Sequence, residues 1–188
     1  SVAGRSYHNL VIRNSGAKTA AGAISVLGNL TVEAGSRFEA ASFTHSIKGN
    51  LTNSAGTDFV AGTSRIVFDG AANSLITGLN TQFNQLEVNK SGASTYLELA
   101  NNVQTTDLII SSGSLRTNAN VVTVTGTRSG NGWVFGTIRR QHTFLNNTSY
   151  AFAGPYNTIS LPNAAGITAI TVTNTDRKST RLNSSHRI

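Results

Sequence analysis

The chain of 188 residues contains no cysteine and no methionine, and only two prolines. The absence of cysteine excludes disulfide bridges, thiolate metal sites and a cysteine nucleophile. It does not decide the compartment, because bacterial surface proteins often do without disulfides. No apolar run reaches the length of about 18 residues that a membrane-spanning helix needs, so we expect no membrane insertion.

Charge is also scarce. Charged residues make up 12% of the chain, roughly half the usual share of about 25% in soluble domains. Glycine, serine, threonine and asparagine take their place, which is typical of extracellular β proteins. Before residue 176 the basic residues are scattered, and only Arg139 and Arg140 are adjacent. A nucleic-acid partner requires a cluster of basic residues, so we expect no nucleic-acid binding.

The last thirteen residues are set aside. Residues 176–186, DRKSTRLNSSH, resemble the translation of a common short-read sequencing adapter, so we interpret 176–188 as a non-native, disordered tail. Without them the formal net charge falls from +7 to +4, because the tail holds four basic residues and one acidic residue. We expect the natural protein to continue beyond Thr175, and to begin before Ser1.

Apolar residues alternate with polar ones along most of the chain, which predicts short β-strands and no long α-helix. Short turn sequences rich in glycine, asparagine and serine separate these strands. The alternating pairs are Leu10/Ile12, Ile24/Val26, Leu30/Val32, Ile66/Phe68, Leu86/Val88, Leu97/Leu99, Leu108/Ile110 and Val122/Val124. The fold class is therefore all-β.

An internal repeat indicates which all-β architecture is present. The sequence Gly-Asn-Leu-Thr occurs at 28–31 and again at 49–52, and a longer echo relates Leu10 to Leu86 and Leu30 to Leu108. A β-sandwich needs no such period, whereas a solenoid stacks equivalent residues of successive coils. We predict a right-handed parallel β-solenoid (β-helix) over residues 1–126, in roughly six coils.

Stacked coils place specific side chains above one another. Leu30 and Leu51 should be neighbours in an apolar column, and Asn29 and Asn50 should form a ladder at a turn. The expected inward residues are Leu10, Ile12, Val26, Leu30, Val32, Phe38, Ile47, Leu51, Phe59, Ile66, Phe68, Phe83, Leu86, Val88, Leu97, Leu99, Leu108, Ile110, Leu115 and Val124. The repeat fades after Gly126, so we interpret residues 127–175 as an incomplete, truncated β-sandwich-like module.

Several motifs resemble a repeat found in large secreted proteins of Bacteroidetes-type bacteria. Residues 83–92, FNQLEVNKSG, followed by 111–115, SSGSL, are similar to the pattern F-N-N-L-x-I-N, then G-x-L-x-L-x-S-G-x-L, of those arrays. Residues 62–70, GTSRIVFDG, and 132–139, GWVFGTIR, resemble neighbouring steps of the same arrays. The resemblance covers residues 7–161 and implies a secreted or cell-surface, adhesin-like protein, often carrying a C-terminal sorting domain.

A carbohydrate-active enzyme on a β-helix would need carboxylates that converge on one exposed face. Stacked coils bring few acidic residues together, and Glu87 with Asp107 is the best candidate pair. Chance alignment of two exposed charges is the better interpretation of that pair. The acidic residues before the tail are Glu33, Glu39, Asp58, Asp69, Glu87, Glu98 and Asp107.

The histidines, arginines and threonines form no recognisable metal-binding, ligand-binding or ice-binding motif. His8, His45 and His142 are too dispersed for a metal site, and we expect each to be exposed or in a turn. Arg139 and Arg140 begin a possible binding patch with His142, although a solvated strand is the better interpretation. Threonine pairs at 123/125 and 171/173 do not recur in every coil, as an ice-binding face requires. We therefore assign no catalytic, cofactor-binding or metal-binding residue and expect no cofactor.

Together these features predict a non-catalytic structural or adhesin-like segment that is secreted or on the cell surface. Such a segment would act as a stiff spacer or as a binding face for glycans or other cell-surface proteins. The alternative is a carbohydrate-active β-helix enzyme of the polysaccharide lyase or hydrolase type, with its site in the missing flanks. A groove with converging charged side chains would favour the enzyme, and a polar, uncharged face would favour the spacer.

Overall fold

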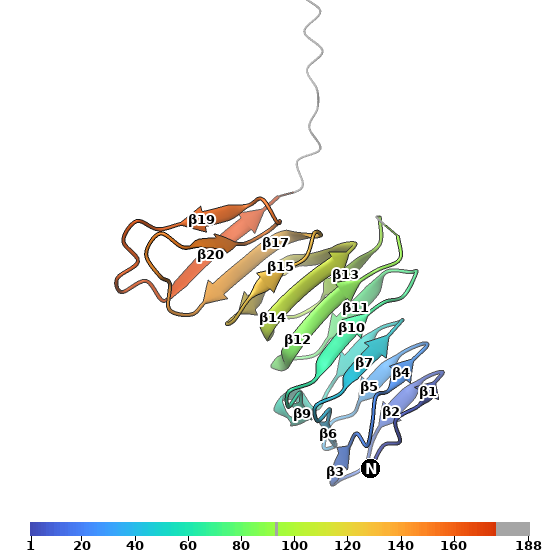
Figure 1. Ribbon diagram of the computed structural model, residues 1–188. Coiled ribbons are helices and arrows are strands. Elements are labelled where there is room, and N and C mark those ends of the chain that lie inside the picture. Colours follow the sequence, from blue (N-terminus) through green and yellow to red (C-terminus); the bar gives the residue numbers. More distant parts are fainter. Residues whose placement is uncertain (93, 176–188) are drawn as a thin grey trace, which may run out of the picture.

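The structure, a computed structural model, describes residues 1–92 and 94–175. Parallel strands stack as a β-solenoid of about seven turns, which confirms the predicted fold class. Figure 1 shows the strands rising in order from the N-terminal end to the last coil. The tail at 176–188 lies outside the described residues.

The coils have three faces, each built from strands of successive turns. Face A contains β1 (Ser6–Tyr7), β4 (Ser25–Val26), β7 (Thr44–Ile47), β10 (Arg65–Phe68), the second halves of β12 (Thr81–Asn89) and β14 (Val103–Ser112), and β16 (Arg128–Ser129). Face B contains β2 (Leu10–Ile12), β5 (Leu30–Val32), β8 (Leu51–Asn53), β11 (Ser74–Thr77), β13 (Tyr96–Leu99) and the first parts of β15 (Ser114–Val124) and β17 (Trp133–Gln141).

Face C begins with a separate sheet and continues in the long strands. The separate sheet contains β3 (Ala17–Thr19), β6 (Arg37–Glu39) and β9 (Phe59–Val60). Above it, the first halves of β12 and β14 pair with each other, and the ends of β15 and β17 extend the same ladder. The long strands therefore turn a corner between two faces without ending.

The core is a set of vertical apolar columns inside the coils. Leu30 pairs with Leu51 in parallel register, as predicted, and Leu51 pairs in turn with Ile76. Every residue expected to point inward is buried except Leu10, which is half-buried and packs against the core. On face C the column is aromatic: the ring centroids of Phe38 and Phe59 lie 5.9 Å apart, and those of Phe59 and Phe83 lie 5.6 Å apart.

The repeated sequence Gly-Asn-Leu-Thr forms the corner at which the chain enters face B, and each of its four residues has a structural role there. A Cβ atom on Gly49 would lie 2.5 Å from the carbonyl oxygen of Gly28, so only glycine allows the two corners to stack. The side-chain oxygen of Asn29 accepts a hydrogen bond from the N–H of Asn50, which confirms the asparagine ladder. The leucine enters the core, and the threonine faces outward.

The longer echo is not a structural period. Leu10 lies on face B in β2, whereas its match Leu86 lies on face A in β12. Leu30 and its match Leu108 are separated in the same way. The structural repeat is one coil, of 18 to 25 residues on face B, as the registers Leu97 with Leu115 and Leu51 with Ile76 indicate. The echo repeats a strand-and-turn motif on a different face.

Parallel pairing continues past Gly126. Trp133–Phe135 extend face B and Thr137–Arg140 extend face C, so the boundary expected at 126/127 does not coincide with a break in the ladders. The architecture changes after Gln141. There β20 (Ala169–Asn174) pairs antiparallel with β17, and β18 (Ser149–Ala151) forms an antiparallel pair with β19 (Thr158–Ser160). As a division into domains, 1–126 and 127–175 stays a prediction.

These last strands cover the end of the stack, beyond β17 in Figure 1. Phe144 and Phe152 are buried in the same apolar cluster as Val134 and Ile138 of β17. The segment after Gln141 thus supplies the apolar cap that an open-ended solenoid requires.

Candidate functional site

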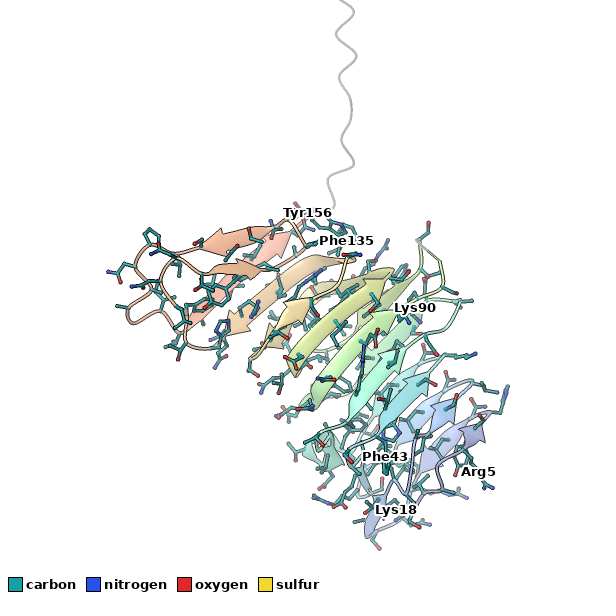
Figure 2. The ribbon with its side chains drawn as sticks, in the orientation of Figure 1. Arg5, Lys18, Phe43, Lys90, Phe135 and Tyr156 are labelled. Carbon is teal, nitrogen blue, oxygen red and sulfur yellow. The ribbon has the colours of Figure 1, made fainter. Side chains whose placement is uncertain are left out.

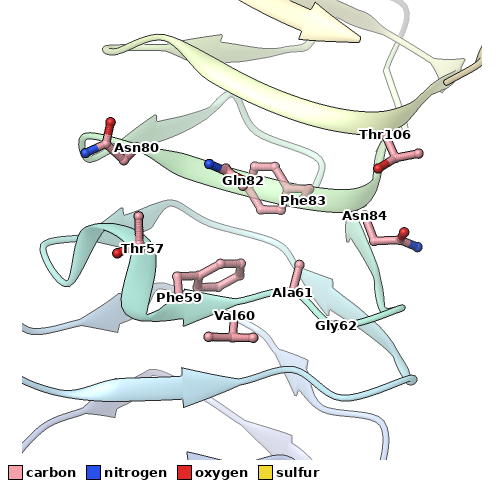
Figure 3. Close-up of a pocket in the computed structure, with 10 residues that line it drawn as sticks. All are labelled: Thr57, Phe59, Val60, Ala61, Gly62, Asn80, Gln82, Phe83, Asn84 and Thr106. Atoms are coloured by element: carbon pink, nitrogen blue, oxygen red, sulfur yellow. The ribbon is translucent and has the colours of Figure 1, made fainter. Parts of the chain in front are cut away.

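The hydrogen-bonded ladder of face C is interrupted between β9 and β12. The sheet of β3, β6 and β9 ends at β9, and β12 pairs upward with β14. Residues Gly56–Asp58, in a short 3-10 turn (η1), lie directly before β9. The interruption leaves a groove between the two strands (Figure 3).

This groove, which we call the face C groove, has a volume of about 320 Å³. Phe59 and Phe83 line it, and they are almost fully buried, at 2% and 4% exposure. Figure 3 shows the polar side chains of both coils around these two rings. The lining residues are Thr57, Phe59, Val60, Ala61, Gly62, Asn80, Gln82, Phe83, Asn84 and Thr106, and none of them carries a charge.

A second groove of about 340 Å³ adjoins the first and shares Asn80 and Gln82 with it. It lies over the next two coils of face C, because Gln82 pairs with Gln104, and Gln104 with Thr123. Its lining residues are Leu79, Asn80, Thr81, Gln82, Asn101, Asn102, Val103, Gln104, Asn120 and Thr123. The two grooves form one uncharged strip along the axis of the stack.

Four amide side chains in this strip have no hydrogen-bond partner within the described part of the chain: Asn80, Gln82, Asn84 and Gln104. Other asparagines beside them are occupied, since Asn101 accepts from the N–H of Gly78 and Asn102 from the N–H of Val121. Each free amide offers two donors and one acceptor oxygen. We refer to these four residues as the free amides. Successive coils repeat at about 4.8 Å, so Gln82 and Gln104 can contact one extended ligand.

The acidic pair considered from sequence is not aligned in register. Glu87 pairs in register with Ile109, and Asp107 with Gln85. The buried Glu87 carboxylate forms an ion pair with Arg65 at 2.5 Å, and it accepts a hydrogen bond from Ser111. Burial opposes ionisation of Asp107, but hydrogen bonds from Thr127 and Gln85 outweigh it and hold its pKa below the ordinary value. Each carboxylate is thus bound by its own neighbouring side chains, and the two do not act as a pair.

The expectation that His45 is exposed or in a turn is wrong. His45 lies in β7 and is 3% exposed. Its Nδ1 accepts a hydrogen bond from the N–H of Ile24, so Nε2 carries the proton and donates to the carbonyl oxygen of Ala40. Burial lowers the pKa of His45, against an opposing effect of the Ala40 hydrogen bond. The period-two alternation of β7 places His45 on the inward side, together with Ile47. Because its side chain is polar, His45 was not among the residues expected to point inward.

The interpretation of Arg139 and Arg140 as a solvated strand is correct for Arg139 only. Arg139 is exposed, whereas Arg140 points into the core and is 3% exposed. His142 lies beside Arg140, with its Nε2 atom 3.1 Å from the guanidinium.

The threonines at 123 and 171 are separated by Arg139 in the ladder, so they form no continuous rank.

Within residues 1–92 and 94–175, no three histidine or acidic side chains cluster as metal ligands do. No helix in that part of the chain is long and apolar enough to cross a bilayer. Comparisons with protein-family models, curated proteins and solved structures gave no match.

The face C groove was not predicted from sequence. The coil lengthens from 21 residues, between Leu30 and Leu51, to 25, between Leu51 and Ile76. The four extra residues lie at the corner between face A and face B, because Ile47 and Phe68 still pair 21 residues apart. The lengthening is therefore no signal of the groove.

Proposed function

We propose that the protein is a non-catalytic, secreted or cell-surface β-solenoid that holds neutral glycans on face C and acts as a stiff spacer. The observation that carries this proposal is the uncharged strip with its four free amides. Sugar hydroxyls donate and accept hydrogen bonds, and an amide side chain can do both at once. A strip free of charge suits a neutral polysaccharide, since it presents no buried charge to be desolvated.

The shape of the strip supports an extended ligand. The two grooves meet at Asn80 and Gln82 and follow the axis of the stack. A linear glycan can therefore contact amides of several coils, and several weak contacts add along its length. The parallel ladders and continuous core that position the amides also make the stack stiff.

A polysaccharide-binding assay with two variants tests this proposal. Affinity electrophoresis against a panel of neutral polysaccharides is expected to retard the protein with at least one of them. The double variant Gln82→Ala/Gln104→Ala should weaken that retardation at least about tenfold, since two polar contacts are lost. Gln141→Ala is the matched control, because Gln141 is an exposed glutamine that lines neither groove.

Two outcomes contradict the proposal. Retention that survives the double variant, or that Gln141→Ala weakens equally, would exclude the strip as the binding face. Release of shorter sugars from any retained polysaccharide, measured as new reducing ends or new double bonds, would exclude the non-catalytic part and favour the lyase or hydrolase alternative.

A further inference from the structure

Two arginines enter the core at the capped end of the stack. Arg128 pairs with Leu108 and continues a column that contains Leu86 and Leu108. Arg140 pairs with Val124 and continues the column of face C that contains Thr105 and Val124. Arg128 is 6% exposed and Arg140 is 3% exposed. Inward positions that hold uncharged residues, mostly apolar, in the coils below are thus cationic here.

Main-chain carbonyl groups hold both guanidinium groups in place. The terminal nitrogens of Arg128 donate to the carbonyl oxygens of Ser129, Gly130, Gly132 and Ala153. Arg140 donates to the carbonyl oxygens of Ala151 and Gly126 and contacts Nε2 of His142. These bonds fix the geometry but neutralise no charge. They leave one N–H of the Arg140 Nη1 atom, and the Nε atoms of both arginines, without a partner in the described chain.

The two positive charges also lack a paired anion. No carboxylate oxygen of the described residues lies within 4.0 Å of either guanidinium. Burial lowers the pKa of Arg140, and Tyr150 and then Asp107 act against that effect from a longer distance. The Asp107 carboxylate already accepts hydrogen bonds from Thr127 and Gln85. Burial and, to a smaller extent, the neighbouring charge of Arg140 together lower the pKa of Arg128 to about 10. Even so, both groups are charged at neutral pH.

A cavity of about 410 Å³ opens over both arginines. Tyr150 and Ser149 contribute hydroxyl groups to its wall, and neither hydroxyl donates a hydrogen bond within the described chain. The lining residues are Thr125, Gly126, Thr127, Arg128, Arg140, His142, Ser149, Tyr150 and Ala151. None of these lining residues is acidic. We propose that this cavity binds a compact oxyanion, namely a carboxylate, sulfate or phosphate group.

The chemistry of the wall favours an oxyanion over a neutral ligand. Two fixed guanidinium groups in a partly desolvated site attract an anion more strongly than exposed lysines do. The Nη1 atom of Arg140 and the hydroxyls of Tyr150 and Ser149 can donate to its oxygens in charge-assisted hydrogen bonds. This site lies at the capped end of the stack and shares no residue with the face C groove. It is therefore independent of the proposed function.

Thermal-shift titration tests the site without altering the buried arginines. Sodium sulfate, sodium phosphate and sodium glucuronate are titrated at constant ionic strength, with glucose as the uncharged probe. Anions that bind the folded state should raise the melting temperature in a saturable manner. Saturation by glucuronate and not by the inorganic ions would identify an acidic sugar as the source of the oxyanion. Saturation by sulfate or phosphate would identify the inorganic ions.

Two aspartate variants distinguish the cavity from the rest of the surface. Ser149→Asp places a carboxylate in the wall of the cavity and should weaken anion binding at least about tenfold, by like-charge repulsion. Ser160→Asp is the matched control, because Ser160 is the exposed cross-strand partner of Ser149 and does not line the cavity. Circular dichroism and the urea midpoint without anions verify that both variants fold.

The proposal is overturned if no anion gives a saturable shift, or if the two aspartate variants weaken binding equally. A shift that depends only on ionic strength also overturns it, because screening acts without a site. A tenfold loss confined to Ser149→Asp supports the cavity.

Discussion

The side-chain oxygen of Asn29 accepts a hydrogen bond from the main-chain N–H of Asn50, at a distance of 2.9 Å. The same contact recurs one coil below, where the side-chain oxygen of Asn9 accepts a hydrogen bond from the N–H of Asn29. It recurs one coil above, where the side-chain oxygen of Asn50 accepts a hydrogen bond from the N–H of Leu75. Each asparagine thus satisfies a backbone donor that the turn removes from the strand ladder.

Replacement of Asn29 by alanine should lower the free energy of unfolding by about 0.5–1.5 kcal/mol, the usual net contribution of one hydrogen bond. The corner is exposed, so water replaces part of the lost contact. Urea unfolding measures the change. Asn131→Ala is the control, because Asn131 is exposed and its side chain makes no hydrogen bond within the described chain. Equal effects of the two variants would show that the ladder adds nothing.

Leu51→Ala should have a larger effect, a loss of about 2–5 kcal/mol, because it leaves a cavity in a closely packed column. Leu51 is fully buried between Leu30 and Ile76. Val11→Ala serves as the control, since Val11 is 49% exposed on face B. The measurement is again the urea midpoint with its slope, and a loss below that of Val11→Ala would contradict a stacked core.

The burial of His45 predicts a dependence of stability on pH. Its pKa in the folded protein lies below the ordinary value of about 6.5. The unfolded chain therefore binds more protons, and the free energy of unfolding should fall as the pH drops below about 6.5, by at most about 1.4 kcal/mol per pH unit. Protonation of Nδ1 would also place a proton against the N–H of Ile24.

Urea midpoints between pH 5 and pH 8 test this dependence. His45→Gln, which does not titrate, should flatten it, whereas His8→Gln, at an exposed position, should leave it unchanged. If the midpoint of the wild-type protein does not move over this range, the assignment of a neutral, buried His45 is wrong.

The burial of Lys90 predicts that stability also depends on pH in the alkaline range. It is fully buried in the middle of the stack (Figure 2), with its Nζ atom 2.5 Å from the Oγ atom of Ser74 and 3.1 Å from the carbonyl oxygen of Ala72. Burial lowers its pKa to about 8, although Asp69 acts in the other direction. The charged form is disfavoured in the folded state, so the free energy of unfolding should rise as the pH increases from about 8 to about 10.5.

Other groups titrate over the same range, so the comparison of variants is decisive. Lys90→Met should remove the rise, and Lys48→Met, at an exposed lysine of the same face, should retain it. Urea unfolding at pH 7.5, 8.5 and 9.5 measures the slopes. Identical slopes for wild type and Lys90→Met would contradict the assignment. The contact with Ser74 lies in the core and not in a cavity, so we assign Lys90 a structural role.

The sequence by itself determined the solenoid. Alternation fixes which side chains enter the core, because a strand has a period of two, and the Gly-Asn-Leu-Thr repeat fixes the stacking of Leu30 on Leu51. Only the tertiary structure decided where the ladder of face C breaks, since the groove depends on how β9 and β12 fail to pair across coils. It also decided that His45, Lys90, Arg128 and Arg140 are buried. A polar side chain gives no sign in sequence that carbonyl groups, distant along the chain, will satisfy it inside.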